Sequence, residues 1–257
     1  MSTLSSCASF RHSGKLGDVI YSLAVVRYFR RVRFFLNAPG PEFSLEAAQG
    51  LLPLLRAQPY VEDVGIWSGE HFDFDLDRFR TQLPVTGNLV DRHAAALGFA
   101  SPDPTEPWLW VEHPVRQPGR PVVFCRSASY RGVPGFWERC YEAFGSKASF
   151  IGTDPEHTDF CRSFGRIVRV EVEDILELAR LIAGASLVVA NQSCPYAIAE
   201  GLKRPVIQET CPTLPNCMFS RLNAAFVLMA EHLELALEAI EEAGIVPTEV
   251  SSVQPFI

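Results

Sequence analysis

The sequence has no apolar run long enough to cross a membrane, which argues against a helical membrane protein. A membrane-spanning helix needs about 18 or more consecutive apolar residues, and no stretch of the 257 residues approaches that length. The first residues, MSTLSSCASFRHSGK, also lack the apolar core of a signal peptide. We therefore expect a cytoplasmic protein.

Cysteine pairs and an excess of positive charge are absent as well. The seven cysteines form no C-x-x-C pair and their number is odd, which favours reduced thiols over a disulfide framework or a zinc site. The 23 Lys and Arg stand against 30 Asp and Glu, a net charge of −7, whereas proteins that coat nucleic acid are usually basic. With 47% hydrophobic residues, the composition is that of an ordinary globular protein.

What is present is an alternation of short apolar strands with amphipathic stretches, typical of a parallel α/β protein. We expect strands over 7–10, 32–37, 63–67 and 71–77, with helices over 18–29 and 44–56. Further strands are expected over 121–125, 148–152, 166–170, 186–190 and 205–209, with helices over 173–185 and 230–243.

A proline-rich zone at 101–121 places a boundary near residue 115, because proline removes backbone donors and blocks regular structure. We therefore predict two Rossmann-like domains, 1–115 and 116–257. Ligands would bind in the cleft between them, at the carboxyl ends of the strands.

The segment HSGKLGD at 12–18 lies between a predicted strand and a predicted helix. Gly14 and Gly17 allow the backbone to approach a ligand, and the following helix N-terminus favours an anion. The spacing is neither that of a P-loop nor that of a dinucleotide fingerprint. Asp18 is a candidate functional carboxylate, and the alternative is a first-turn acid that complements the helix dipole.

Two further polar turns follow strands of the second half. Arg126, Ser127, Ser129 and Arg131 bring two guanidiniums and two hydroxyls to a strand end, and arginine suits phosphate because its donors form a planar fork. The alternative is a solvated loop whose arginines pair with nearby acids.

The third polar turn begins a helix within 188–207. Ser193 and the amides after it form an anion site. Glu200, two turns along that helix, is a candidate acceptor for ribose hydroxyls or, alternatively, a buried and satisfied acid.

Taken together, the three segments resemble the glycosyltransferase family 9, the heptosyltransferase type. The resemblance is carried by three stretches, HSGKLGDVIYSLAVVRYFRR, RSASYRGVPGFWERCYEAF and LARLIAGASLVVANQSCPYAIAEGLKRPVIQE. It covers roughly residues 9–36 and 121–245. It implies the GT-B fold, with two Rossmann-like domains and the nucleotide-sugar bound mainly by the second.

The resemblance also implies roles for individual residues. Asp18 matches the aspartate that acts as general base, and Arg131 lies near the basic residue that steadies the donor diphosphate. The implied donor site comprises Gly14, Lys15, Gly17, Arg126, Ser127, Arg131, Gln192, Ser193, Cys194, Pro195, Tyr196 and Glu200.

Three positions depart from the family pattern. Gln192 stands where the family has aspartate, Cys194 where it has glycine, and Ala197 where it has histidine. These changes leave open a nucleotide-sugar-binding relative without catalysis, or an epimerase or hydrolase on the same fold. A cysteine nucleophile at Cys194, whose thiol pKa a helix N-terminus would lower, lacks a recognisable histidine partner.

The resemblance predicts an inverting glycosyltransferase that needs neither metal nor cofactor and uses a nucleotide-diphosphate sugar as co-substrate. Asp73, Asp75 and Asp77 would share one face of an extended strand, which leaves a metal site as an alternative. The acceptor stays open among a glycan, a small molecule, a protein and a modified nucleobase. The oligomeric state also stays open.

Overall fold

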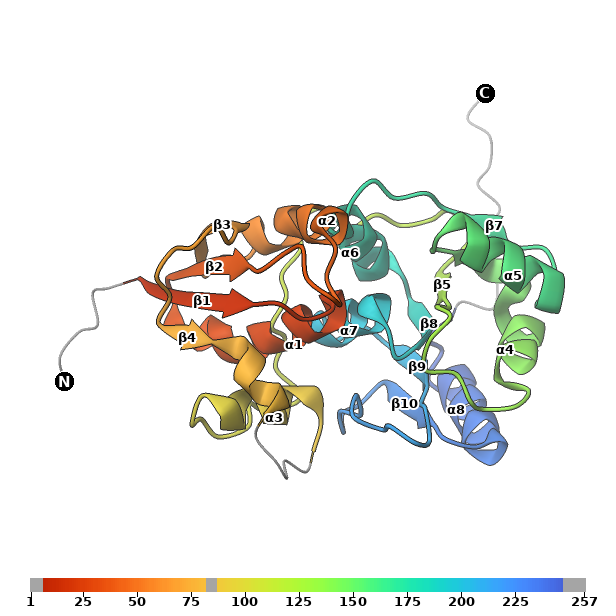
Figure 1. Cartoon of the computed structure of the whole chain (residues 1–257). Helices are drawn as coiled ribbons and strands as arrows, with labels where there is room; N and C mark the ends of the chain where they lie inside the picture. Colours follow the sequence, from red (N-terminus) through yellow and green to blue (C-terminus); the bar gives the residue numbers. More distant parts are fainter. Residues whose placement is uncertain (1–6, 82–86, 247–257) are drawn as a thin grey trace.

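A computed structural model, which describes residues 7–81 and 87–246, contains two parallel β-sheets with helices around them (Figure 1). The first sheet has the strand order β3-β2-β1-β4. Its strands are β1 (Ala8–His12), β2 (Val32–Leu36), β3 (Val61–Ile66) and β4 (Phe74–Asp75). The predicted strand over 71–77 is therefore only two residues long, and it passes directly into the 3-10 helix η2 (Leu76–Arg80).

The helices of this half are α1 (Leu16–Val26), α2 (Leu45–Arg56) and α3 (Leu89–Ala96). The predicted helix over 18–29 begins two residues earlier and ends at Val26. The 3-10 helix η1 (Arg27–Phe29) follows, and Arg30, with a φ of 57°, stops the run in the left-handed region. Ser44 caps α2, since its side chain accepts a hydrogen bond from the Ala47 amide (3.1 Å).

The second sheet has the strand order β10-β9-β8-β5-β6-β7. Its strands are β5 (Val122–Cys125), β6 (Ala148–Phe150), β7 (Val168–Arg169), β8 (Leu187–Asn191), β9 (Val206–Glu209) and β10 (Ala224–Val227). All its pairings are parallel. The central strands β5, β8 and β9 are buried along their whole length because helices cover both faces. The edge strand β10, whose residues are mostly half-buried, was not predicted.

The helices of this half are α4 (Phe136–Phe144), α5 (Asp154–Phe164), α6 (Ile175–Gly184), α7 (Cys194–Gly201) and α8 (Ala230–Glu242), with the 3-10 helix η3 (Gly145–Lys147). The predicted helices over 173–185 and 230–243 are confirmed. Asp174 caps α6 by accepting a hydrogen bond from the Glu177 amide (2.8 Å).

Helices join the two sheets in the middle of the molecule (Figure 1). Helix α1 packs on α7 and α2 packs on α6, and every residue of α1 from Val19 to Val26 is buried. A single apolar cluster contains residues of β1, β2, α1, α6, α7 and β8. The segment 97–121 that leads from α3 to β5 contains no helix or strand. Among the described residues no helix has the length and apolar character needed to cross a membrane.

Candidate functional site

The first wall of the site is the turn between β1 and α1. The Gly14 amide donates a hydrogen bond to His12 Nδ1 (2.8 Å). A Cβ on Gly14 would lie 2.5 Å from both the His12 ring and Arg80 Nη2, so the turn can close only with glycine here. Gly17 has no such constraint, since the nearest atom to its Cβ position is 3.9 Å away, on Tyr21.

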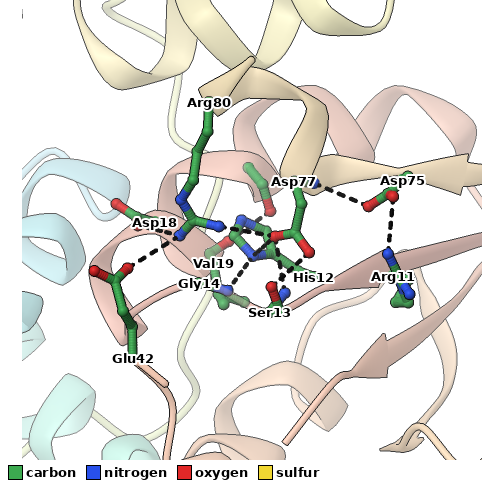
Figure 2. A network of polar contacts seen from close by, with 11 residues as sticks. Arg11, His12, Ser13, Gly14, Asp18, Val19, Glu42, Asp75, Asp77 and Arg80 are labelled. Atoms are coloured by element: carbon green, nitrogen blue, oxygen red, sulfur yellow. Dashed lines mark hydrogen bonds and ion pairs between the residues drawn. The ribbon is translucent and has the colours of Figure 1, made fainter. Parts of the chain in front are cut away.

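Asp18 lies in the first turn of α1, where Arg80 holds its carboxylate. Arg80 Nη2 is 3.0 Å from Asp18 Oδ2 and 3.8 Å from Glu42 Oε2, and Arg80 Nη1 is 3.1 Å from Asp77 Oδ1. Figure 2 shows the guanidinium reaching between these three acids. Burial raises the pKa of Asp18, and the Arg80 charge opposes that rise. The result is a partly desolvated carboxylate in a fixed orientation, with 19% of its side chain exposed.

The three aspartates of the FDFDLD segment pair with alternate residues of the neighbouring strand and the turn after it. Asp73 accepts hydrogen bonds from Ser9, Asp75 pairs with Arg11 (2.8 Å), and Asp77 accepts from the Ser13 amide and hydroxyl (3.0 and 2.6 Å). The alternation follows from the parallel pairing of β4 with β1. Within 7–81 and 87–246 no three His, Cys, Asp or Glu side chains are grouped to hold a metal ion. These carboxylates stabilise the sheet edge.

The second wall consists of the loop after β5 and the N-terminus of α7. Asn191, the last residue of β8, joins the two, because its Oδ1 accepts from the Ser127 amide and its Nδ2 donates to Ser127 Oγ (both 3.0 Å). Ser193 is the residue before α7, and Pro195 occupies the first turn, where its missing amide costs nothing. Ser193 and Cys194 at the start of α7 line the same cavity as Asp18.

Between the two walls lies a cavity of about 620 Å³. Seven of the predicted site residues line it: Lys15, Gly17, Asp18, Ser127, Gln192, Ser193 and Cys194. Lys15 lies over the ring of Tyr130 at 6.0 Å. The cavity is thus formed at the carboxyl ends of β1, β5 and β8, where parallel sheets place their ligands.

Arg126 and Arg131 do not line this cavity. Asp159 on α5 pairs with both, at 2.6 Å from Arg126 Nη1 and 3.5 Å from Arg131 Nη1. Arg131 Nε also donates to the Ser127 carbonyl (2.6 Å). In this structure the two arginines therefore pair with an acid, as the alternative interpretation of this loop proposed. The sequence alone did not identify Asp159 as that acid, because it lies 28 residues or more from the two arginines.

Glu200 is a correction to the predicted donor site, and the side chain of Tyr196 also lies outside the cavity. Glu200 is fully buried, and its carboxylate accepts hydrogen bonds from Lys203 Nζ (2.6 Å) and Arg221 Nε (3.0 Å). A ribose cannot reach it, so the structure favours the buried, satisfied acid. Tyr196 is also fully buried, with no hydrogen-bond partner for its hydroxyl in the described structure. Both side chains point into the core because α7 packs against α1.

Cys194 and Gln192 line the cavity but differ from expectation. Burial raises the pKa of the Cys194 thiol to about 12, which outweighs the helix N-terminus and argues against a nucleophilic thiolate. The Gln192 amide is used by the loop after β9, since its Nε2 donates to the Leu214 carbonyl (2.9 Å) and its Oε1 accepts from the Cys211 amide (2.6 Å). Gln192 therefore shapes that loop.

Sequence reasoning missed several residues that line the cavity or hold Asp18. Arg80 and Glu42 contact the Asp18 network, and Tyr130, Leu89 and Asn216 line cavities beside it. The FDFDLD segment offered one signal. The strand β4 in this segment pairs with β1. Arg80, which follows β4, therefore comes close to the turn after β1.

A scan against protein-family models and a search of curated proteins gave no match. Solved structures do match over nearly the whole chain. The E. coli heptosyltransferase WaaC with ADP-2-deoxy-2-fluoro heptose has a TM-score of 0.63 at 12% identity, covering 93% of this chain and 98% of that one. A glycosyl transferase family 9 protein from Veillonella parvula DSM 2008 has a TM-score of 0.60 at 12% identity, with 94% and 91% covered. The E. coli ADP-heptose lps heptosyltransferase II has a TM-score of 0.62 at 14% identity, with 92% and 98% covered. The chain therefore has the GT-B fold that the motifs implied.

Proposed function

We propose that the protein is an inverting glycosyltransferase that uses a nucleotide-diphosphate sugar. The observation that carries this proposal is the position of Asp18, a partly desolvated carboxylate that faces a helix N-terminus across a cavity between two sheets. The fold shared with heptosyltransferases, one of them holding an ADP-heptose analogue, supports a nucleotide-sugar as donor. Residues of the second half, 121–245, would provide most of the donor contacts.

In the proposed reaction Asp18 takes the proton of an acceptor hydroxyl. The acceptor oxygen then forms a bond to the anomeric carbon from the face opposite the leaving group. The bond from that carbon to the diphosphate breaks, and the nucleoside diphosphate leaves with the electron pair. Burial of Asp18 makes it a stronger base than an exposed aspartate, and Arg80 keeps the carboxylate oriented.

Charge on the leaving diphosphate would be stabilised without a metal ion. Ser193 and Cys194 at the start of α7, together with Ser127 and Lys15, line the cavity, and their amide, hydroxyl and ammonium groups would be the donors. Preorganised donors of this kind can take the role that a divalent ion has in other transferases. Arg131 would join them by exchanging Asp159 for a phosphate oxygen, because its carboxylate partner is 41% exposed and held at 3.5 Å.

A second candidate function is nucleotide-sugar binding without transfer. It is favoured by the use of the Gln192 amide to hold the loop after β9 and by the pairing of both motif arginines with Asp159. A test of turnover distinguishes it from the transferase.

The test is release of nucleoside diphosphate from a panel of nucleotide-sugars, with and without EDTA, followed by NMR of the anomeric configuration of the product. We expect release with inverted configuration for one donor, unaffected by the chelator. Retained configuration, or activity that EDTA abolishes and added metal restores, would contradict the mechanism. Binding of nucleotide-sugars without release from any donor would support the second candidate.

A further inference from the structure

A second and larger cavity, of about 760 Å³, lies next to the Asp18 site and has no role in the function proposed above. Its walls come from the start of α3, from the segment 101–108 and from the loop 213–220 that precedes β10. Much of the lining is carbon, contributed by Val90, Pro102, Pro104, Trp108, Met218 and Phe219. Such a wall suits an aromatic or aliphatic body and offers little to a free sugar.

The larger cavity communicates with Asp18 through a smaller one of about 320 Å³. Arg92, Leu214 and Asn216 line both the larger and the smaller cavity. The smaller cavity in turn shares Lys15, Asp18 and Asn216 with the donor-side cavity. Asp18 therefore lies between the donor-side cavity and the passage to the carbon-lined one.

Two stacked rings separate the larger cavity from the donor side. Phe219 lines the larger cavity, and its ring stacks on that of Tyr21, which lines the donor side, with centroids 5.5 Å apart. Trp108 packs against Phe219 at 5.7 Å. A molecule in the larger cavity would thus reach the donor through the passage beside Asp18.

The passage contains an arginine without a counter-charge. Arg92 makes no ion pair within residues 7–81 and 87–246, and its Nε is buried without a hydrogen-bond partner there. None of the described acids that line these cavities forms an ion pair with Arg92. Asp91 accepts from the Asn88 amide (2.9 Å), Asp103 accepts from the Thr105 amide (2.8 Å), and Asp18 and Glu42 face Arg80. A guanidinium that is partly desolvated and unpaired is suited to an anionic ligand group.

We propose that the larger cavity binds the body of an amphiphilic acceptor, and that Arg92 pairs with a carboxylate or phosphate of this acceptor near the hydroxyl to be glycosylated. This inference rests on the proposed transferase function, because it places the hydroxyl of the bound acceptor beside Asp18. Arg92 is then a specificity-determining residue.

The test uses two fluorescent dyes with the same aromatic body. Anilinonaphthalene sulfonate carries one anionic group, and phenylnaphthylamine carries none. We expect the wild type to bind the sulfonate about tenfold more tightly than the neutral dye. Arg92→Met should abolish that preference and leave the affinity for phenylnaphthylamine unchanged, Arg92→Lys should restore part of it, and Arg78→Met, outside all three cavities, should preserve it.

A cavity-filling variant and two competitions complete the test. Met218→Trp should weaken both dyes without lowering the melting temperature shift that a nucleoside diphosphate produces. Benzoate or phenyl phosphate should displace the sulfonate dye, and benzyl alcohol should not. The stronger competitor of the two shows whether Arg92 prefers a carboxylate or a phosphate. Two dye results would overturn the inference: equal affinities in the wild type, or an unchanged preference in Arg92→Met. Two competition results would also overturn it: equal competition by benzyl alcohol, or displacement of both dyes by a nucleoside diphosphate. Failure of the transferase proposal would appear separately, as absent turnover with the dye results intact.

Discussion

The two walls of the donor-side cavity differ in how their charges are satisfied. On the first wall Asp18, Asp77 and Glu42 share Arg80, and alternate residues of β1 and β4 pair along the sheet edge. On the second wall, two arginines depend on one carboxylate, that of Asp159, which is 41% exposed. In the proposed reaction the first wall would supply an oriented proton acceptor, whereas the second would supply cations that a diphosphate could recruit.

The largest expected effect comes from the first wall. Asp18→Asn keeps the shape of the side chain and removes the proton acceptor, so transfer should fall ~10²–10⁴-fold with little change in donor affinity. Steady-state rates and nucleoside diphosphate titrations measure the two quantities. Asp63→Asn on the exposed part of β3 is the matched control. If Asp18→Asn keeps more than about a tenth of the wild-type rate, Asp18 only complements the helix dipole.

The next effect is on stability, at the core between the two walls. Glu200→Gln leaves the buried Lys203 and Arg221 cations without a countercharge, so we expect a loss of about 3 kcal/mol in the free energy of unfolding. Urea denaturation measures it, with Glu238→Gln on the exposed side of α8 as control. Nucleoside diphosphate affinity should stay the same, and a weakened affinity for nucleosides in the folded variant would restore the ribose assignment.

Acid should weaken the first wall through His12. Burial lowers the pKa of His12 to about 3, with the Arg80 charge adding to the effect. The folded state keeps this ring neutral while the unfolded chain takes up a proton below pH 6.5, so stability falls as the pH drops from about 6.5 toward 3. The contribution approaches ~1.4 kcal/mol per pH unit in that window.

His12→Asn can still accept the hydrogen bond from Gly14 and removes the titrating group. Its urea unfolding free energy should therefore depend less steeply on pH between 6 and 4 than that of the wild type. His93, whose ring centroid lies 5.3 Å from that of His12, also has a pKa lowered mainly by burial, so the variant should keep part of the pH dependence. Equal slopes for the two proteins would mean that His12 does not stay neutral in the fold.

The weakest of these effects is expected on the second wall, where Asp159 pairs with Arg131. Asp159→Asn removes the carboxylate that competes with a phosphate for Arg131, so nucleoside diphosphate affinity should rise by about threefold. Isothermal titration measures it. The matched control is Asp154→Asn on the same helix, which removes one acidic partner of Arg169 in β7. A fall in affinity would show that Asp159 orients Arg131 for the donor.

The sequence predicted the helices α1, α2, α6, α7 and α8, the central strands and the turns at the ends of β1, β5 and β8, because hydrophobic periodicity and turn residues are local signals. It gave no range for α3, α4 and α5. It did not predict β10, a half-buried edge strand without a clear apolar run. Arg80 and Asp159 were missed because their partners lie far away in the sequence and meet them only in the folded chain. Glu200 was misplaced because its helix position does not reveal that Lys203 and Arg221 enclose its carboxylate.

The melting temperature with and without a nucleoside diphosphate shows whether such a ligand binds between the two walls. At ligand concentrations ~100 times the dissociation constant, binding adds about 2.7 kcal/mol to the free energy of unfolding. For a chain of this size the melting temperature should rise by about 5 °C with one of the uridine, adenosine, guanosine, cytidine or thymidine diphosphates. Arg131→Ala should remove most of that shift. No shift with any of the five at millimolar concentration would mean that no nucleoside diphosphate binds there, and the transferase proposal would fail.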